Sequence, residues 1–124
     1  MTALQVTLLT LYAFGMAVGQ MLFKSTADRI AANKIQTFAD CVVRCIKLTF
    51  DPIFMLAIVL YMAMTVLWIW ILSFTPLSRA YPFVALAFVF TIAMGVFFFR
   101  EAVTGMQLFG LASILLGIVI ISRG

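Results

Sequence analysis

Residues 52–99 read PIFMLAIVLYMAMTVLWIWILSFTPLSRAYPFVALAFVFTIAMGVFFF, and Arg79 is the one charged side chain among them. A helix needs about 20 apolar residues to cross the roughly 30 Å hydrocarbon core of a bilayer. That length is met by two apolar runs, Pro52–Phe74 and Ala80–Phe99, which the tight turn Thr75–Ser78 separates. The stretch therefore predicts two membrane-crossing helices joined as an antiparallel hairpin.

Two more apolar runs flank this hairpin, Ala3–Phe23 before it and Gly105–Ser122 after it. Hydrophobic residues make up 66% of the 124 residues and charged residues 10%, a composition that excludes a water-soluble fold. Because the runs are continuous rather than alternating, they also exclude a membrane β-barrel. We expect an all-α polytopic membrane protein in which residues 1–124 form a single domain of four transmembrane helices.

The segment between the first two runs predicts an additional, interfacial helix at Gln36–Phe50. Its apolar stripe and its charged stripe face opposite ways, which is typical of a helix lying at the level of the lipid headgroups. Asp51 and Pro52 then fit the N-cap and first turn of the next helix. Cys41 and Cys45 cannot complete a zinc site without a histidine, so we expect no metal and assign them to packing or membrane contact.

The basic residues are scattered at the ends of the apolar runs, which does not indicate nucleic-acid binding. Six lie in the first and third connections, whereas Arg79 and Arg123 lie on the other side. The positive-inside rule then predicts that both termini are periplasmic in a bacterial inner membrane. Identical subunits that insert in opposite orientations need a weak charge bias, so this bias favours a similar-sized partner subunit, with a homodimer still open. The six residues are Lys24, Arg29, Lys34, Arg44, Lys47 and Arg100.

Polar candidates for a binding site cluster at two places. Gln20 and Lys24 lie one turn apart on the same face, at the end of the first helix. Arg79 lies beside the start of the third helix, where free N–H groups and the helix dipole favour an anion. Together these groups suit a phosphate at the membrane surface. The alternative is that each is an interfacial anchor whose long side chain reaches the headgroups.

Catalytic signatures are missing from the sequence. It contains no histidine, no glycine-rich phosphate loop and no paired carboxylates within the apolar runs, so we expect neither an enzyme nor a bound cofactor. Small residues do recur at helical spacing, and such residues let helices approach closely in lipid. They lie in the first run at Ala13, Gly15, Ala17 and Gly19, and in the last run at Gly110, Ser113 and Gly117.

The chain resembles the small multidrug resistance-type branch of the drug/metabolite transporter superfamily. The resemblance rests on residues 75–82 (TPLSRAYP) and 110–118 (GLASILLGI). Within that branch it is similar to subunits of the aminoarabinose-phosphoundecaprenol flippase, through Gly19-Gln20 with Lys24, Ala80-Tyr81-Pro82 and Arg100-Glu101-Ala102-Val103.

The resemblance implies that two small four-helix subunits move an undecaprenyl-phosphate-linked sugar between leaflets. It also implies substrate binding by Gln20, Lys24, Arg79, Tyr81, Arg100 and Glu101, and subunit contact through Gly110, Ser113 and Gly117.

The chain departs from the multidrug exporters of this branch, which carry a glutamate midway along the first helix. Residues 11–15 read LYAFG here, with no acid. Val84 replaces an aromatic residue, and residues 86–88 (LAF) replace a Gly-x-Gly kink. An anionic lipid substrate needs no such acid.

Two alternatives stay open: proton-coupled export of small cations through Glu101, and an accessory subunit that holds a glycosyltransferase or other lipid-modifying enzyme. Glu101 also has two structural interpretations, an ion pair with Arg100 or a cap on the fourth helix.

Overall fold

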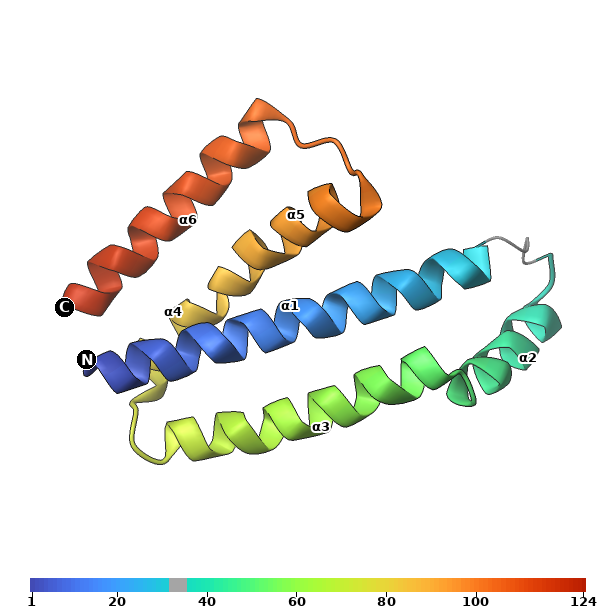
Figure 1. The fold of residues 1–124 in the computed structure, drawn as a ribbon, viewed down its shortest axis with the longest axis horizontal. Helices are drawn as coiled ribbons and strands as arrows, with labels where there is room; N and C mark the ends of the chain where they lie inside the picture. The colour runs from blue at the N-terminus through green and yellow to red at the C-terminus, as the bar shows by residue number, and fades with distance from the viewer. Residues whose placement is uncertain (32–35) are drawn as a thin grey trace.

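The computed structural model describes residues 1–31 and 36–124, and the elements in these ranges are all α-helices (Figure 1). Four spans are long and apolar enough to cross a membrane, with α4 and α5 together forming the third. The predicted all-α fold with four membrane spans is therefore confirmed. The helices are α1 (Ala3–Ala31), α2 (Phe38–Thr49), α3 (Pro52–Leu72), α4 (Leu77–Val84), α5 (Leu86–Phe99) and α6 (Gly105–Arg123).

Helix α1 lies in the middle of the fold, with α3 on one side and α4 and α5 on the other (Figure 1). Helix α6 packs against α4 and α5 at the outer edge. Both termini lie at the same end as the α3–α4 turn, and we call this the terminal end. The opposite end, which we call the α2 end, holds α2, the start of α3 and the α5–α6 connection.

Among the described basic residues, Arg79 and Arg123 lie toward the terminal end, and the others lie toward the α2 end. This separation agrees with the two groups used for the orientation prediction. Lys34, which that prediction also counted, lies outside the described residues.

Small residues let α1 pack closely against its neighbours. Ala13 and Ala17 are fully buried, as the small-residue spacing of the first run allows. Gly19 lies so near the Tyr61 ring that an added Cβ would sit 2.6 Å from Tyr61 Cε2. Tyr61 is also stacked on Phe23, with ring centroids 5.0 Å apart. The small residues of the first span therefore serve packing within one chain.

Helix α2 forms close to its predicted bounds and starts after Thr37, whose side chain accepts a hydrogen bond from the Asp40 N–H. Asp51 caps α3 as predicted, because its carboxylate accepts hydrogen bonds from the N–H groups of Ile53 (2.9 Å) and Phe54 (3.2 Å). Pro52 occupies the first turn of α3.

The start of the third span differs from the prediction. Helix α4 begins at Leu77, three residues before the predicted run Ala80–Phe99, and Pro82 lies inside the helix. Proline has no N–H and its ring crowds the carbonyl four residues earlier. The span is interrupted at Ala85, whose N–H donates to Pro82 O at 3.1 Å in the tighter i to i+3 pattern. Neighbouring helices make such a break tolerable in a membrane.

Candidate functional site

Two adjoining cavities lie between α1 and the broken third span. The larger has a volume of about 570 Å³ and is mostly apolar, with Tyr81 among its lining residues. The smaller has a volume of about 170 Å³ and reaches Lys24 and Glu101. Gln20 and Thr91 line both cavities, so the two form one path, which we call the α1–α5 groove.

An ion-pair cluster closes the groove at the α2 end. Lys24 Nζ lies 3.2 Å from Asp28 Oδ1, one turn later on α1, and 3.8 Å from Glu101 Oε1. The side chains of Lys24 and Glu101 are about half exposed, at 47% and 55%. Exposed pairs of this kind contribute about 0–1 kcal/mol, so the contact between α1 and the α5–α6 connection is weak enough to break and re-form.

Backbone geometry places Glu101 beside Lys24. Arg100 ends α5 in the left-handed conformation (φ 54°), and the Glu101 N–H then donates to Gly95 O at 3.1 Å. The Glu101 carboxylate lies over Gly95, where an added Cβ would be 2.7 Å from Oε2. Gly95 therefore leaves the room that the carboxylate occupies.

Both structural interpretations of Glu101 are wrong. Its ion-pair partner is Lys24 and not Arg100, and in the described part of the chain Arg100 forms no ion pair. The cap of α6 is Thr104, which forms a capping box with Gln107. Glu101 is thus free to face the groove because another residue satisfies the start of α6.

Gln20 joins the groove to α3. Its Nε2 amide donates to the Tyr61 hydroxyl at 2.9 Å, and the residue also lines both cavities. Tyr81 is exposed and lines the larger cavity, nearer the start of the third span. The structure thus brings four of the predicted site residues onto one groove, namely Gln20, Lys24, Tyr81 and Glu101.

Arg79 and Arg100 are not part of this arrangement. The residues lining the two cavities include neither of them, and both side chains are exposed. Arg79 lies two positions before Tyr81, and residues two apart on a helix face different directions.

Thr91 is a groove residue that the sequence analysis missed. It is the one polar residue within α5, and its hydroxyl donates to Ala87 O at 2.7 Å. A single hydroxyl in an apolar run can donate its hydrogen bond to a carbonyl of its own helix, so its presence in the sequence does not by itself indicate a binding site.

The small-residue stripe of α6 is open in the described chain. Gly110 and Ser113 are exposed, and a Cβ added at Gly110 or Gly117 would meet nothing within 4 Å. The stripe does not serve packing among residues 1–31 and 36–124, and its role in subunit contact stays a prediction.

Comparison with known proteins gives one family and two relatives. The profile of the EamA-like transporter family matches residues 2–123. A probable 4-amino-4-deoxy-L-arabinose-phosphoundecaprenol flippase subunit ArnE from Hamiltonella defensa is 36% identical over 47% of this chain and 52% of its own length. The protein of the same name from Proteus mirabilis is 40% identical over 44% of this chain and 49% of its own length. The matched region thus spans about half of each relative. No solved structure matches the chain.

Proposed function

Because the chain belongs to the EamA-like transporter family and is a multi-pass membrane transporter, we propose that it is a subunit of a flippase for an anionic lipid, an undecaprenyl-phosphate-linked sugar. The two relatives named as flippase subunits support this substrate class. The observation that carries the proposal is a cationic group at the end of an apolar groove, Lys24 Nζ held 3.8 Å from Glu101.

The groove suits a molecule with an apolar chain and an anionic head. A polyprenyl chain fits against the mostly apolar cavity between α1 and the third span. The phosphate then lies at the smaller cavity, where the Lys24 ammonium and the Gln20 amide offer hydrogen-bond donors. An excess of apolar lining with a few placed polar groups is the usual composition of a ligand site.

Lys24 acts by exchanging one anionic partner for another. In the structure its ammonium is shared between Asp28 and Glu101. An entering phosphate replaces the Glu101 carboxylate, so the charge of Lys24 stays compensated while the α5–α6 connection is released. The weak pair thus links substrate arrival to opening of the groove at the α2 end, which we place in the cytoplasm.

A second subunit completes the transporter in this proposal. The open stripe Gly110, Ser113 and Gly117 on α6 is suited to close contact with a helix of a similar small chain. The strong charge bias favours a distinct partner over an inverted copy. Native mass spectrometry distinguishes a homodimer from a heterodimer by subunit mass.

Surface display of the lipid-linked sugar tests the proposed function. A membrane-impermeant amine reagent applied to intact cells labels an amino sugar only after it reaches the outer leaflet. We expect Lys24→Gln to lower labelling at equal protein level, and Lys24→Arg to retain it in part. Arg123→Gln removes a charge at the terminal end and serves as the matched control. Normal labelling with Lys24→Gln would contradict the role of Lys24.

The position of Glu101 favours one second candidate, proton-coupled export of small cations. Its half-exposed carboxylate lies at the mouth of the groove, where this mechanism requires an acidic group. A resistance assay that compares the wild-type chain with Glu101→Gln decides between the two. Loss of resistance to cationic compounds supports export, whereas unchanged resistance excludes it.

A further inference from the structure

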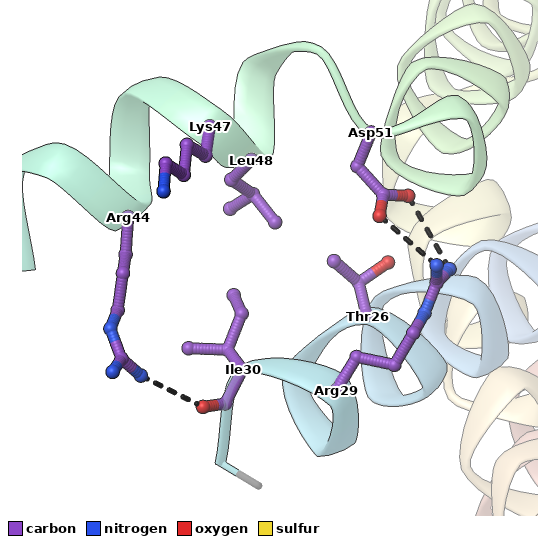
Figure 2. Close-up of a pocket in the computed structure, with 7 residues that line it drawn as sticks. All are labelled: Thr26, Arg29, Ile30, Arg44, Lys47, Leu48 and Asp51. Carbon is purple, nitrogen blue, oxygen red and sulfur yellow. Dashed lines mark hydrogen bonds and ion pairs between the residues drawn. The ribbon is translucent and has the colours of Figure 1, made fainter. Parts of the chain in front are cut away.

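A third cavity, of about 300 Å³, lies apart from the α1–α5 groove, where α2 passes the end of α1 and the start of α3 (Figure 2). We call it the α2 pocket. Its apolar lining comes from Ile30 and Leu48. Its polar lining residues are Thr26, Arg29, Arg44, Lys47 and Asp51.

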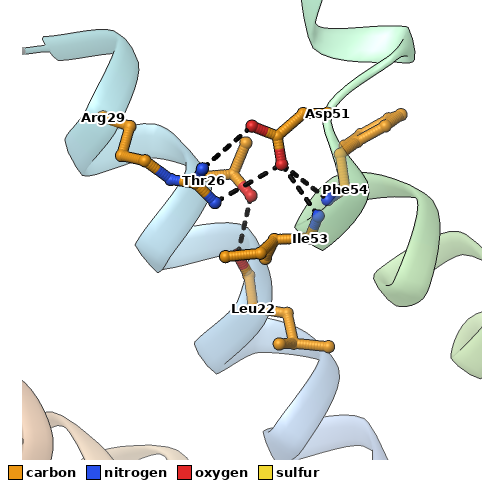
Figure 3. Close-up of polar contacts among 6 residues, drawn as sticks. All are labelled: Leu22, Thr26, Arg29, Asp51, Ile53 and Phe54. Atoms are coloured by element: carbon orange, nitrogen blue, oxygen red, sulfur yellow. Dashed lines mark hydrogen bonds and ion pairs between the residues drawn. The ribbon is translucent and has the colours of Figure 1, made fainter.

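The single carboxylate of the pocket is already fully engaged. Asp51 caps α3 and also pairs with Arg29 through two contacts, Nη1 to Oδ2 at 3.1 Å and Nη2 to Oδ1 at 3.4 Å (Figure 3). Thr26 turns its hydroxyl to Leu22 O (2.9 Å) and is buried. Arg29 and Asp51 thus cancel each other, and the excess positive charge of the pocket comes from Arg44 and Lys47.

Only one of these two cations is explained by the fold. The Arg44 guanidinium donates from Nη1 to Ile30 O at 3.2 Å, at the carbonyl-rich end of α1 where a cation is favourable. Lys47 lies one turn later on the same side of α2 and faces the same cavity. Within residues 1–31 and 36–124 the Lys47 ammonium forms no ion pair. A second cation aimed into the pocket favours an anionic ligand.

The depth of the pocket identifies the source of that anion. Helix α1 has 29 residues, and at 1.5 Å per residue it is about 43 Å long, against roughly 30 Å of hydrocarbon. The last turns of α1 line the pocket, which therefore lies at headgroup level. Helix α2 also exposes large apolar residues away from the pocket, including Phe38 (85%) and Ile46 (58%). Such a helix rests its apolar face in lipid and its basic face among headgroups.

We propose that the α2 pocket binds the phosphate of an anionic phospholipid from the surrounding leaflet, with Lys47 and Arg44 as its cationic donors. The lipid anchors the connection between α1 and α3 at the membrane surface. This site is separate from the α1–α5 groove and does not depend on which substrate the groove carries.

Native mass spectrometry of the full chain in detergent tests the proposal, with phosphatidylglycerol, phosphatidylcholine or inorganic phosphate as the probe. We expect a preference for phosphatidylglycerol that Lys47→Gln reduces about fivefold, from the usual contribution of one basic residue near an anionic surface. Lys47→Arg should retain the preference. Arg123→Gln, which removes an exposed charge at the terminal end, should leave it unchanged.

Three results would overturn the proposal. Equal loss in Lys47→Gln and Arg123→Gln would mean that overall charge alone attracts the lipid. An unchanged preference in Lys47→Gln would remove Lys47 from the site. Inorganic phosphate that binds as well as phosphatidylglycerol, with the same dependence on Lys47, would assign the pocket to a soluble anion instead of a lipid. Because the readout is lipid binding, none of these results depends on transport.

Discussion

Gly19→Ala is the substitution whose effect on the free energy of unfolding follows most directly from the geometry. The added Cβ would lie 2.6 Å from Tyr61 Cε2 and 3.0 Å from Cζ. Ordinary carbon contacts are about 3.5–4.0 Å, so the ring or the helix must move by about 1 Å. Rotation of the Tyr61 ring would lose favourable contacts, since the ring stacks on Phe23 and its hydroxyl accepts a hydrogen bond from the Gln20 amide.

The net cost comes from three contributions. Overpacking costs about 1–3 kcal/mol, and loss of the Gln20 to Tyr61 hydrogen bond adds about 1 kcal/mol. Alanine recovers about 1 kcal/mol through its higher helix propensity. We therefore expect the free energy of unfolding to fall by about 1–3 kcal/mol.

Unfolding by SDS in mixed micelles, followed by the fluorescence of Trp68 and Trp70, measures this change. Gly105→Ala is the matched control, because nothing lies within 4 Å of its added Cβ, and the substitution should not lower the free energy of unfolding. In a Tyr61→Ala background the Gly19→Ala cost should disappear. A cost that persists there, or one no larger than that of Gly105→Ala, would refute the close-contact explanation.

Three further substitutions test other parts of the structure. Gly95→Ala should displace the Glu101 carboxylate from Lys24, because the added Cβ would lie 2.7 Å from Oε2, and sugar display should fall with little loss of stability. A drop in display that is accompanied by a large drop in the free energy of unfolding would contradict this explanation, because loss of folded protein would then account for it. Asp51→Ala removes the cap of α3 and the Arg29 partner, so SDS unfolding should show a loss of about 1–2 kcal/mol, whereas Asp51→Asn should lose less. Gly110→Leu fills the open stripe of α6, so native mass spectrometry should show loss of the subunit complex while the stability of the single chain is unchanged. Persistence of the complex would place the interface elsewhere.

The membrane spans could be predicted from sequence because their length and apolarity are dictated by the bilayer itself. The Asp51 cap and the α2 helix were equally accessible, since both rest on local rules of spacing and capping. The start of the third span was predicted three residues too late, because the turn residues Leu77 and Ser78 belong to α4 and a membrane helix tolerates Pro82 inside a span. The ion pair between Lys24 and Glu101 could not be predicted from the sequence, because hydrophobic periodicity does not show which helix ends lie next to each other.

The α1–α5 groove was predicted only in part for a similar reason. Gln20 and Lys24 share a helix face, so their spacing placed them together correctly. Arg79 and Tyr81 were assigned to one site, but two positions on a helix point in different directions. Thr91 and the α2 pocket depend on how α5 and α2 pack, which no local pattern encodes.

Photocrosslinking from the groove tests the central claim most directly. A photoreactive phenylalanine analogue at Phe88, which lines the larger cavity, captures whatever occupies it in the native membrane. Mass analysis should find a polyprenyl-phosphate-linked sugar, with less of it when Lys24→Gln is present. Capture of cationic compounds instead of a phosphate-bearing lipid, with no dependence on Lys24, would contradict the account.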